Sequence, residues 1–389
     1  MTKLVADWLE TPSTVAVCNM LTQAGHQAWF VGGCVRNALM GQPVSDLDIC
    51  TDARPERVMD LASTAGLRAV PTGIDHGTVT VVSDGVPYEI TTFRQDVETD
   101  GRRAVVAFAD TIEADAHRRD FTFNALYCAP DGTISDPIGG IPDLQSRTVR
   151  FIDDPAQRIK EDYLRILRFF RFSAWYSDPD NGIEAEGLAA CAEHADGLES
   201  LSKERIGAEM IKLLSAPDPA PAVAAMAASG VLMRILPGAG AHLLAVLVHV
   251  EQAAGLHPEP IRRLAALGGQ DVGEALRLSN TQAKRLMLLS DQMALETPPT
   301  ELGYRLGRDA GNDVLALRAA LMGREIPNER LEQVAFGSAQ TFPLTANELM
   351  PDFAGPALGQ ALRQAEHEWI ASGFSMTKHA LVEACKKRG

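Results

Sequence analysis

The stretch WFVGGCVRNALMGQPVSDLDICTD, residues 29–52, places a strand, a glycine turn and two aspartates close together in the chain. The apolar run Trp29–Val31 predicts a short buried strand. Gly32 and Gly33 then allow the backbone to turn sharply and to approach a ligand closely. A helix with apolar periodicity follows, and its first turn carries Arg36. Free backbone amides at a helix start favour a phosphate, so we expect a triphosphate-binding turn here.

Two carboxylates follow within the same stretch. If residues 45–50 form a strand, Asp46 and Asp48 point to the same face of it. Neighbouring carboxylates repel each other, so a shared face favours a bound cation. Hard oxygen ligands beside a phosphate site suit Mg²⁺. Either feature alone has a simpler explanation, a plain turn or a solvated strand edge, but their combination predicts a triphosphate site facing a metal site.

The segments GGCVRNALMG and SDLDI closely resemble the head motif of the class II nucleotidyltransferases, which include the tRNA CCA-adding enzymes and the bacterial poly(A) polymerases. The resemblance implies an α+β fold, with a small mixed sheet in the head and helices on one side of it. Asn37 stands where the family usually has an aspartate, which leaves any charge-dependent role of this position open.

A candidate third carboxylate lies further along the chain. Residues 76–82 and 86–93 alternate as two strands joined by Ser83-Asp84-Gly85, which predicts a hairpin. Glu89 on the second strand is either a solvated side chain or a partner of the two aspartates. YEITTFR is similar to the family sequence around the third carboxylate, and HGTVTVV resembles the tRNA-adding branch more than the poly(A) branch. Residues 95–110 are rich in charge and glycine and predict a loop.

The segment HRRDFTFNAL, residues 117–126, combines arginines with an aspartate and an asparagine. Such a group can hold a triphosphate and ribose hydroxyls together, although a surface salt bridge is the simpler alternative. RRDFTFNA resembles the ribose-recognition motif of the family almost letter for letter. The resemblance therefore implies nucleotide binding by Arg119, Asp120 and Asn124.

Residues 154–172, DPAQRIKEDYLRILRFFRF, have the periodicity of one amphipathic helix. Asp162 and Arg165 would be neighbours on its polar face. They form either stabilising ion pairs or a pair of planar groups that presents donors and acceptors as a base edge does. EDYLR is similar to the family's templating motif EDxxR, which implies that these two residues select the base. The nucleotide-binding set implied for this helix is Glu161, Asp162, Arg165, Arg168 and Arg171.

Three regions follow from these patterns. We expect a catalytic nucleotidyltransferase head at 1–150 and a helical neck with the nucleotide-selecting helix at 151–235. Residues 236–389 are rich in alanine and leucine and predict helices, and the resemblance implies that they form a body and tail that bind tRNA.

Composition limits the other possibilities. With 389 residues and a net charge of −15, the chain is not expected to coat nucleic acid non-specifically. Six scattered cysteines without a CxxC pair predict reduced thiols and a cytoplasmic protein. We see neither a signal-peptide pattern nor an apolar run long enough for a membrane. The oligomeric state is open between monomer and homodimer.

The resemblance implies template-independent addition of CCA to tRNA 3′ ends from CTP and ATP, with two Mg²⁺ ions held by Asp46, Asp48 and Glu89. A poly(A) polymerase, or an enzyme that adds only CC or only A, is the alternative within the class. A catalytically silent RNA-binding protein is the alternative outside it, and the intact aspartate pair counts against that reading.

Overall fold

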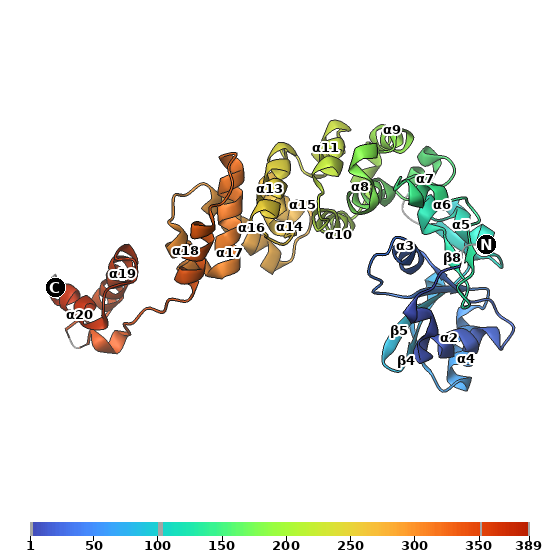
Figure 1. The fold of residues 1–389 in the computed structure, drawn as a ribbon, viewed down its shortest axis with the longest axis horizontal. Coiled ribbons are helices and arrows are strands. Elements are labelled where there is room, and N and C mark those ends of the chain that lie inside the picture. The colour runs from blue at the N-terminus through green and yellow to red at the C-terminus, as the bar shows by residue number, and fades with distance from the viewer. Residues whose placement is uncertain (1–2, 100–103, 351, 388–389) are drawn as a thin grey trace. The chain divides into compact units, whose positions relative to one another are not determined.

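The computed structural model describes residues 3–99, 104–350 and 352–387 (Figure 1). The chain divides into two compact units. The first comprises Met1–Ala241 with Gly269–Arg277, and the second comprises His242–Gly268 with Leu278–Gly389. The first unit combines a sheet with helices and the second is helical, so the predicted α+β class is confirmed.

The main sheet has seven strands in the order β3-β4-β5-β2-β1-β8-β9. Every neighbouring pair is antiparallel except β2 and β5, which run parallel, so the sheet is mixed as expected. The strands are β1 (Trp29–Val31), β2 (Asp48–Thr51), β3 (Arg68–Gly73), β4 (Thr78–Ser83), β5 (Val86–Thr92), β8 (Tyr127–Cys128) and β9 (Ile134–Ser135).

Helices cover both faces of this sheet rather than one. On one face α2 (Pro12–Thr22) and α4 (Pro55–Thr64) pack together and against β4, next to the strand labels in Figure 1. Tyr88 of β5 anchors α2 there, because its hydroxyl donates to Ser13 Oγ over 2.8 Å. On the opposite face, Cys50 shares a core with residues of α5 (Ile112–His117). Alternation along β2 gives both faces apolar side chains, and each therefore needs a cover.

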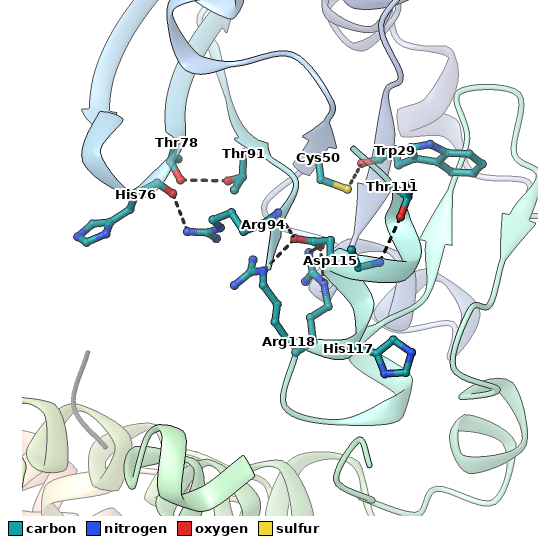
Figure 2. A network of polar contacts seen from close by, with 12 residues as sticks. Trp29, Cys50, His76, Thr78, Thr91, Arg94, Thr111, Asp115, His117 and Arg118 are labelled. Atoms are coloured by element: carbon teal, nitrogen blue, oxygen red, sulfur yellow. Dashed lines mark hydrogen bonds and ion pairs between the residues drawn. The ribbon is translucent and has the colours of Figure 1, made fainter. Parts of the chain in front are cut away.

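The segment expected to be a loop forms a second, two-stranded sheet. β6 (Arg94–Thr99) pairs antiparallel with β7 (Ala104–Phe108), so the loop prediction for these residues was wrong. The hairpin is fixed at its base by Arg94, whose side chain donates to the His76 carbonyl over 2.7 Å. The Arg94 amide donates to Asp115, as Figure 2 shows. His76 and Asp115 both lie far from Arg94 in the sequence, and the charged composition of residues 95–110 predicted a loop in place of the strands.

The helix expected over residues 154–172 is two helices. α7 (Pro155–Glu161) ends just before Asp162, and α8 (Leu164–Tyr176) begins two residues after Asp162. Asp162 has extended backbone angles (φ −152°, ψ 105°), and its side chain accepts from the Leu164 amide over 3.1 Å. An aspartate that satisfies the first amides of a new helix competes with continuation of the old one.

Further helices of the first unit pack against α8. Its neighbours include α10 (Lys203–Leu214) and α11 (Ala220–Ala228). The segment 269–277 joins this unit through Gly207 on α10, where a Cβ would stand only 1.9 Å from the Leu276 carbonyl oxygen. Only glycine permits that approach.

The second unit contains a helical hairpin and a small separate core. α17 (Pro299–Leu321) and α18 (Asn328–Ser338) approach closely, because a Cβ on Gly303 would lie 2.0 Å from the Val334 carbonyl oxygen. Beyond them, α19 (Pro356–Ala371) and α20 (Lys378–Lys386) enclose a core around Trp369. No helix in the described ranges is both long and apolar enough to cross a membrane. All six cysteines are free and buried.

A buried ion network joins α13 (His242–Ala253), α14 (Pro260–Leu267) and α17 in the second unit. Glu251, with a side chain 1% exposed, accepts from Arg262 over 2.7 Å and from Arg263 over 2.7 Å. Arg262 also donates to Asp313 over 2.6 Å. Each charge is stable there only because its partners are present.

We predict that Glu251→Gln destabilises the second unit by about 3 kcal/mol, because two buried guanidiniums lose their shared countercharge. Hydrogen exchange of α13 and α14 amides in the full chain measures this loss. The matched control is Glu301→Gln, which removes a half-exposed i,i+4 pair with Arg305 and should cost under about 1 kcal/mol. Equal effects of the two substitutions would contradict the prediction.

Candidate functional site

The glycine turn lies where the sequence predicts it. Gly32 has φ 72° and precedes α3 (Gly33–Leu39), so it occupies a conformation that favours glycine. A Cβ on Gly32 would stand 3.6 Å from Nη1 of Arg119. The turn therefore brings the start of α3 together with one of the arginines expected to bind the nucleotide.

Arg36, predicted to bind the triphosphate, is buried and makes several contacts within the protein. Its residue is 6% exposed, and its guanidinium donates to Asn124 Oδ1 over 2.5 Å and to the Tyr176 hydroxyl over 2.7 Å. The Tyr176 ring lies under it, with 4.0 Å between the guanidinium carbon and the ring centroid. Burial lowers the pKa of Arg36, partly offset by Tyr176 and Asp120. These contacts favour a role in fixing α3 against α8.

The three predicted carboxylates lie at or near the start of β2. The parallel register sets Asp48 directly beside Glu89 of β5. Asp46 is exposed and precedes β2, which begins at Asp48, so the two aspartates do not share one strand as expected. Burial, Glu89 and Asp46 raise the pKa of Asp48 to about 6, against an opposing effect of Arg119.

This donor set suits a hard divalent cation. All three groups are carboxylates, and burial together with the neighbouring Glu89 and Asp46 disfavours the charged form of Asp48, which a bound cation would stabilise. Within the described residues, no three or more His, Cys, Asp or Glu side chains already lie close enough to hold a metal ion. The metal site, and Glu89 as its third ligand, stay predictions.

Asp115 organises the two arginines of the second motif, and the sequence reading missed it. Its side chain is 1% exposed and accepts from Arg118 over 2.9 Å and from Arg119 over 2.8 Å. It also accepts from the Tyr127 hydroxyl. Burial alone would raise the pKa of Asp115, but the two arginines hold it below its usual range. Figure 2 shows Arg118 and the Arg94 amide converging on this carboxylate. In the sequence, Asp115 lies three residues before Arg118 and four before Arg119, and this spacing could have identified Asp115 as their partner.

Asp120, Asn124 and Arg168 form a connected set, which brings together three residues predicted for nucleotide binding. Asp120 Oδ1 accepts from the Asn124 side-chain Nδ2 over 3.0 Å, and Asp120 Oδ2 accepts from Arg168 Nε over 2.7 Å. Burial would raise the pKa of Asp120, but Arg168 and Asn124 lower it to about 2. The carboxylate is therefore ionised and fixed at neutral pH.

Asp162 and Arg165, the predicted templating pair, each have a countercharge, and the Glu161–Arg165 ion pair expected for this helix is present. Asp162 Oδ2 accepts from Arg205 of α10 over 2.7 Å, while Arg165 donates to Glu161 over 2.5 Å. Glu161 is 5% exposed and also pairs with Arg158. Asp162 and Arg165 were expected to be neighbours on the surface of one helix. They lie instead at the break between α7 and α8, and each has its own countercharge.

Arg171 likewise has a partner that the sequence does not indicate, since it donates to Glu209 of α10 over 2.6 Å. Glu209 is 5% exposed. Glu209 and Arg205, like Tyr176, lie far from the motifs they support. No local pattern in the sequence marks them.

Two family models match the chain. The Poly A polymerase head domain matches residues 28–150, and the probable RNA and SrmB- binding site of polymerase A matches residues 182–243. The chain is 31% identical over 394 residues to CCA tRNA nucleotidyltransferase 1, mitochondrial, of Mus musculus, covering 97% of this chain and 91% of the relative. It is 34% identical over 398 residues to the CCA-adding enzyme of Streptococcus gordonii, covering 97% and 98%.

A solved structure agrees over the same length. The crystal structure of the Bacillus stearothermophilus CCA-adding enzyme in complex with CTP matches with a TM-score of 0.79 and 29% identity, covering 97% of this chain and 98% of that one. The head-domain match and the relatives that match over nearly the whole chain show that the protein is a nucleotidyltransferase. The chain belongs to the class II CCA-adding enzymes, the tRNA nucleotidyltransferases.

We predict that Asp120→Asn lowers the free energy of unfolding at pH 7 by about 2 kcal/mol. The folded-state pKa lies below the ordinary value, so the Asp120–Arg168 pair stabilises the protein above about pH 4. That contribution is lost as the pH falls toward about 2. Urea unfolding of both proteins at several pH values measures the difference.

The control for this substitution is Asp196→Asn, since Asp196 is 78% exposed and pairs with Arg234 at the surface. Its effect should be small at every pH. A destabilisation by Asp120→Asn that stays constant from pH 7 to pH 3 would contradict the assignment.

Proposed function

We propose that this protein adds CCA to the 3′ end of tRNA, one nucleotide at a time, from CTP and ATP and without a nucleic-acid template. The observation that carries the proposal is the parallel register of β2 and β5, which sets Asp48 beside Glu89 next to Asp46 and the glycine turn. Relatives named CCA-adding enzymes match over nearly the whole chain, which supports the tRNA 3′ end as substrate.

Asp46, Asp48 and Glu89 would hold two Mg²⁺ ions. When bound there, the ions would activate the primer's 3′-hydroxyl and offset charge on the triphosphate and the leaving pyrophosphate. The other residues of the site would bind and orient the nucleotide. The amides of Gly32 and Gly33, with Arg119, would bind the triphosphate at the start of α3.

Other residues would hold the sugar and the base of the nucleotide. Asp120 and Asn124, fixed by Arg168, would bind ribose hydroxyls, and Arg171 would support the nucleotide nearby. Asp162 and Arg165 would read the base edge. Because Arg205 and Glu161 already hold these two groups, they need not reorganise when a base arrives. Base selection then depends on fixed donors and acceptors.

The decisive assay supplies the purified protein with tRNA lacking its CCA end, labelled CTP or ATP, and Mg²⁺. Addition of two C residues followed by one A supports the proposal. Addition of C alone or of a single A identifies a partial-adding enzyme, and a long A tail identifies a poly(A) polymerase. Retained tRNA binding without any addition would contradict enzymatic activity.

We predict that Asp46→Ala and Asp48→Ala each reduce nucleotide addition at least 1,000-fold, roughly 4 kcal/mol of barrier, while the melting temperature changes little. Activity falls because each substitution removes a metal ligand. The melting temperature changes little because both side chains are at least partly exposed. Asp60→Ala is the control, since Asp60 is an exposed aspartate on α4 of the same unit. Near-normal addition by Asp46→Ala would show that the catalytic assignment is wrong.

We predict that Asp162→Ala and Arg165→Ala reduce discrimination for CTP and ATP over UTP and GTP by about tenfold or more. A wrong base then no longer leaves a fixed polar group without a partner. Incorporation of all four nucleotides is the measurement, with Asp196→Ala as the control for losing an ion pair. Unaltered selectivity with a lowered melting temperature would mean that the two residues are only structural.

A further inference from the structure

We propose that Asn37 is a positioning residue that ties the segment carrying Asp46 to the buried Arg36. The catalytic part of this inference rests on the proposed function. Its structural part concerns residues 42–46, which connect the end of α3 to β2 and include one of the three carboxylates.

The two ends of the Asn37 amide have different partners. Its Oδ1 accepts from Arg36 Nε over 3.1 Å and from Arg36 Nη2 over 2.9 Å. Its Nδ2 donates to the carbonyl oxygen of Pro43 over 3.0 Å. An amide has both an acceptor and donors, whereas a carboxylate only accepts. Asparagine can therefore make both sets of contacts and ionised aspartate cannot.

Asn37 is also the main attachment of the connecting segment. Its backbone carbonyl accepts from the Gln42 amide over 2.8 Å. In the described part of the chain, the hydrogen bonds found between residues 42–46 and the rest of the protein are this one and the Asn37–Pro43 bond. Ser45 bonds only to its neighbour Asp46, over 2.9 Å. The position of Asp46 thus depends on how firmly Asn37 is held.

Arg36 holds Asn37 firmly because it is itself fixed. Its guanidinium is buried against the Tyr176 ring and bonds to Asn124, which bonds to Asp120. A continuous chain of polar contacts therefore runs from the Asp46 segment through Asn37 and Arg36 to Tyr176, the last residue of α8, the helix that also carries Arg165. Partners of this kind set the orientation of a metal ligand that they do not touch.

Two substitutions separate the two ends of the side chain. Asn37→Asp keeps an acceptor for Arg36 but removes the donor to Pro43 and sets a negative charge against its carbonyl. Asn37→Ala removes both contacts. Asn19→Asp is the matched control, because it makes the same chemical change at an exposed position on α2.

The first readout is hydrogen exchange of residues 41–47 in the metal-free protein. In the wild type the Gln42 amide should be protected, and in both variants its exchange should rise about tenfold, with the sheet unchanged. Asn37→Ala should also lower the melting temperature, because Arg36 loses an acceptor. Fast exchange of Gln42 in the wild type would overturn the proposal whether or not the variants fold.

The second readout is Mn²⁺ binding, followed by electron paramagnetic resonance, with Mn²⁺ as a probe for a carboxylate metal site. We expect about a tenfold weaker Mn²⁺ affinity in Asn37→Asp and no change in Asn19→Asp. In the addition assay the same variant should need more metal for half-maximal rate, while its KM for tRNA stays constant.

The outcomes are distinct from those of the proposed function. If the wild type adds no nucleotides, the proposed function fails, but exchange and Mn²⁺ binding still test the role of Asn37. If Asn37→Asp exchanges like the wild type, or if its segment loosens while Mn²⁺ affinity stays unchanged, Asn37 does not position Asp46.

Discussion

The burial of one guanidinium, that of Arg36, constrains much of the first unit. A buried cation is stable only where rings and acceptors replace the water it loses. Here Tyr176 provides a ring and a hydroxyl, and Asn124 provides an amide oxygen. These residues come from α8 and from the turn before β8, so satisfying Arg36 brings the head and the first long helix after it together.

This constraint extends further through Asp120. The carboxylate bonds to Asn124 on one side and to Arg168 on the other, so the polar contacts of Arg36 continue along α8. The residues of three separate sequence motifs thereby belong to one network. Substitutions of two residues in this network are expected to have non-additive effects on the free energy of unfolding, because their side chains share partners.

The sequence predicts what depends on local chemistry. Trp29–Val31 is a strand as its apolar run indicates, and the turn at Asp84 and Gly85 adopts the positive φ angles that suit a tight hairpin. The motifs also identify most of the polar residues that meet in the first unit. These features follow from residue type and spacing, which a single sequence contains.

The failures arise where distant partners decide the outcome. β6 and β7 form a hairpin whose base is fixed by His76 and Asp115, and the helix breaks at Asp162, whose side chain pairs with Arg205. In the site, Tyr176 and Glu209 are missed for the same reason. Periodicity describes which residues can share a face, but it does not tell which distant side chain will meet them.

Ion pairs between buried carboxylates and arginines make the acidic composition of the chain compatible with the proposed binding of a triphosphate. In the first unit Asp115, Asp120, Glu161 and Glu209 are all buried, and each holds one or two arginines at the site. The carboxylates reduce the net charge but fix the guanidiniums in place before any ligand is bound. Fixed donors stabilise a developing or incoming negative charge better than mobile ones, since they need no reorganisation. Positive charge is thus kept at one defined place, which is why a net charge of −15 is compatible with a phosphate-binding site.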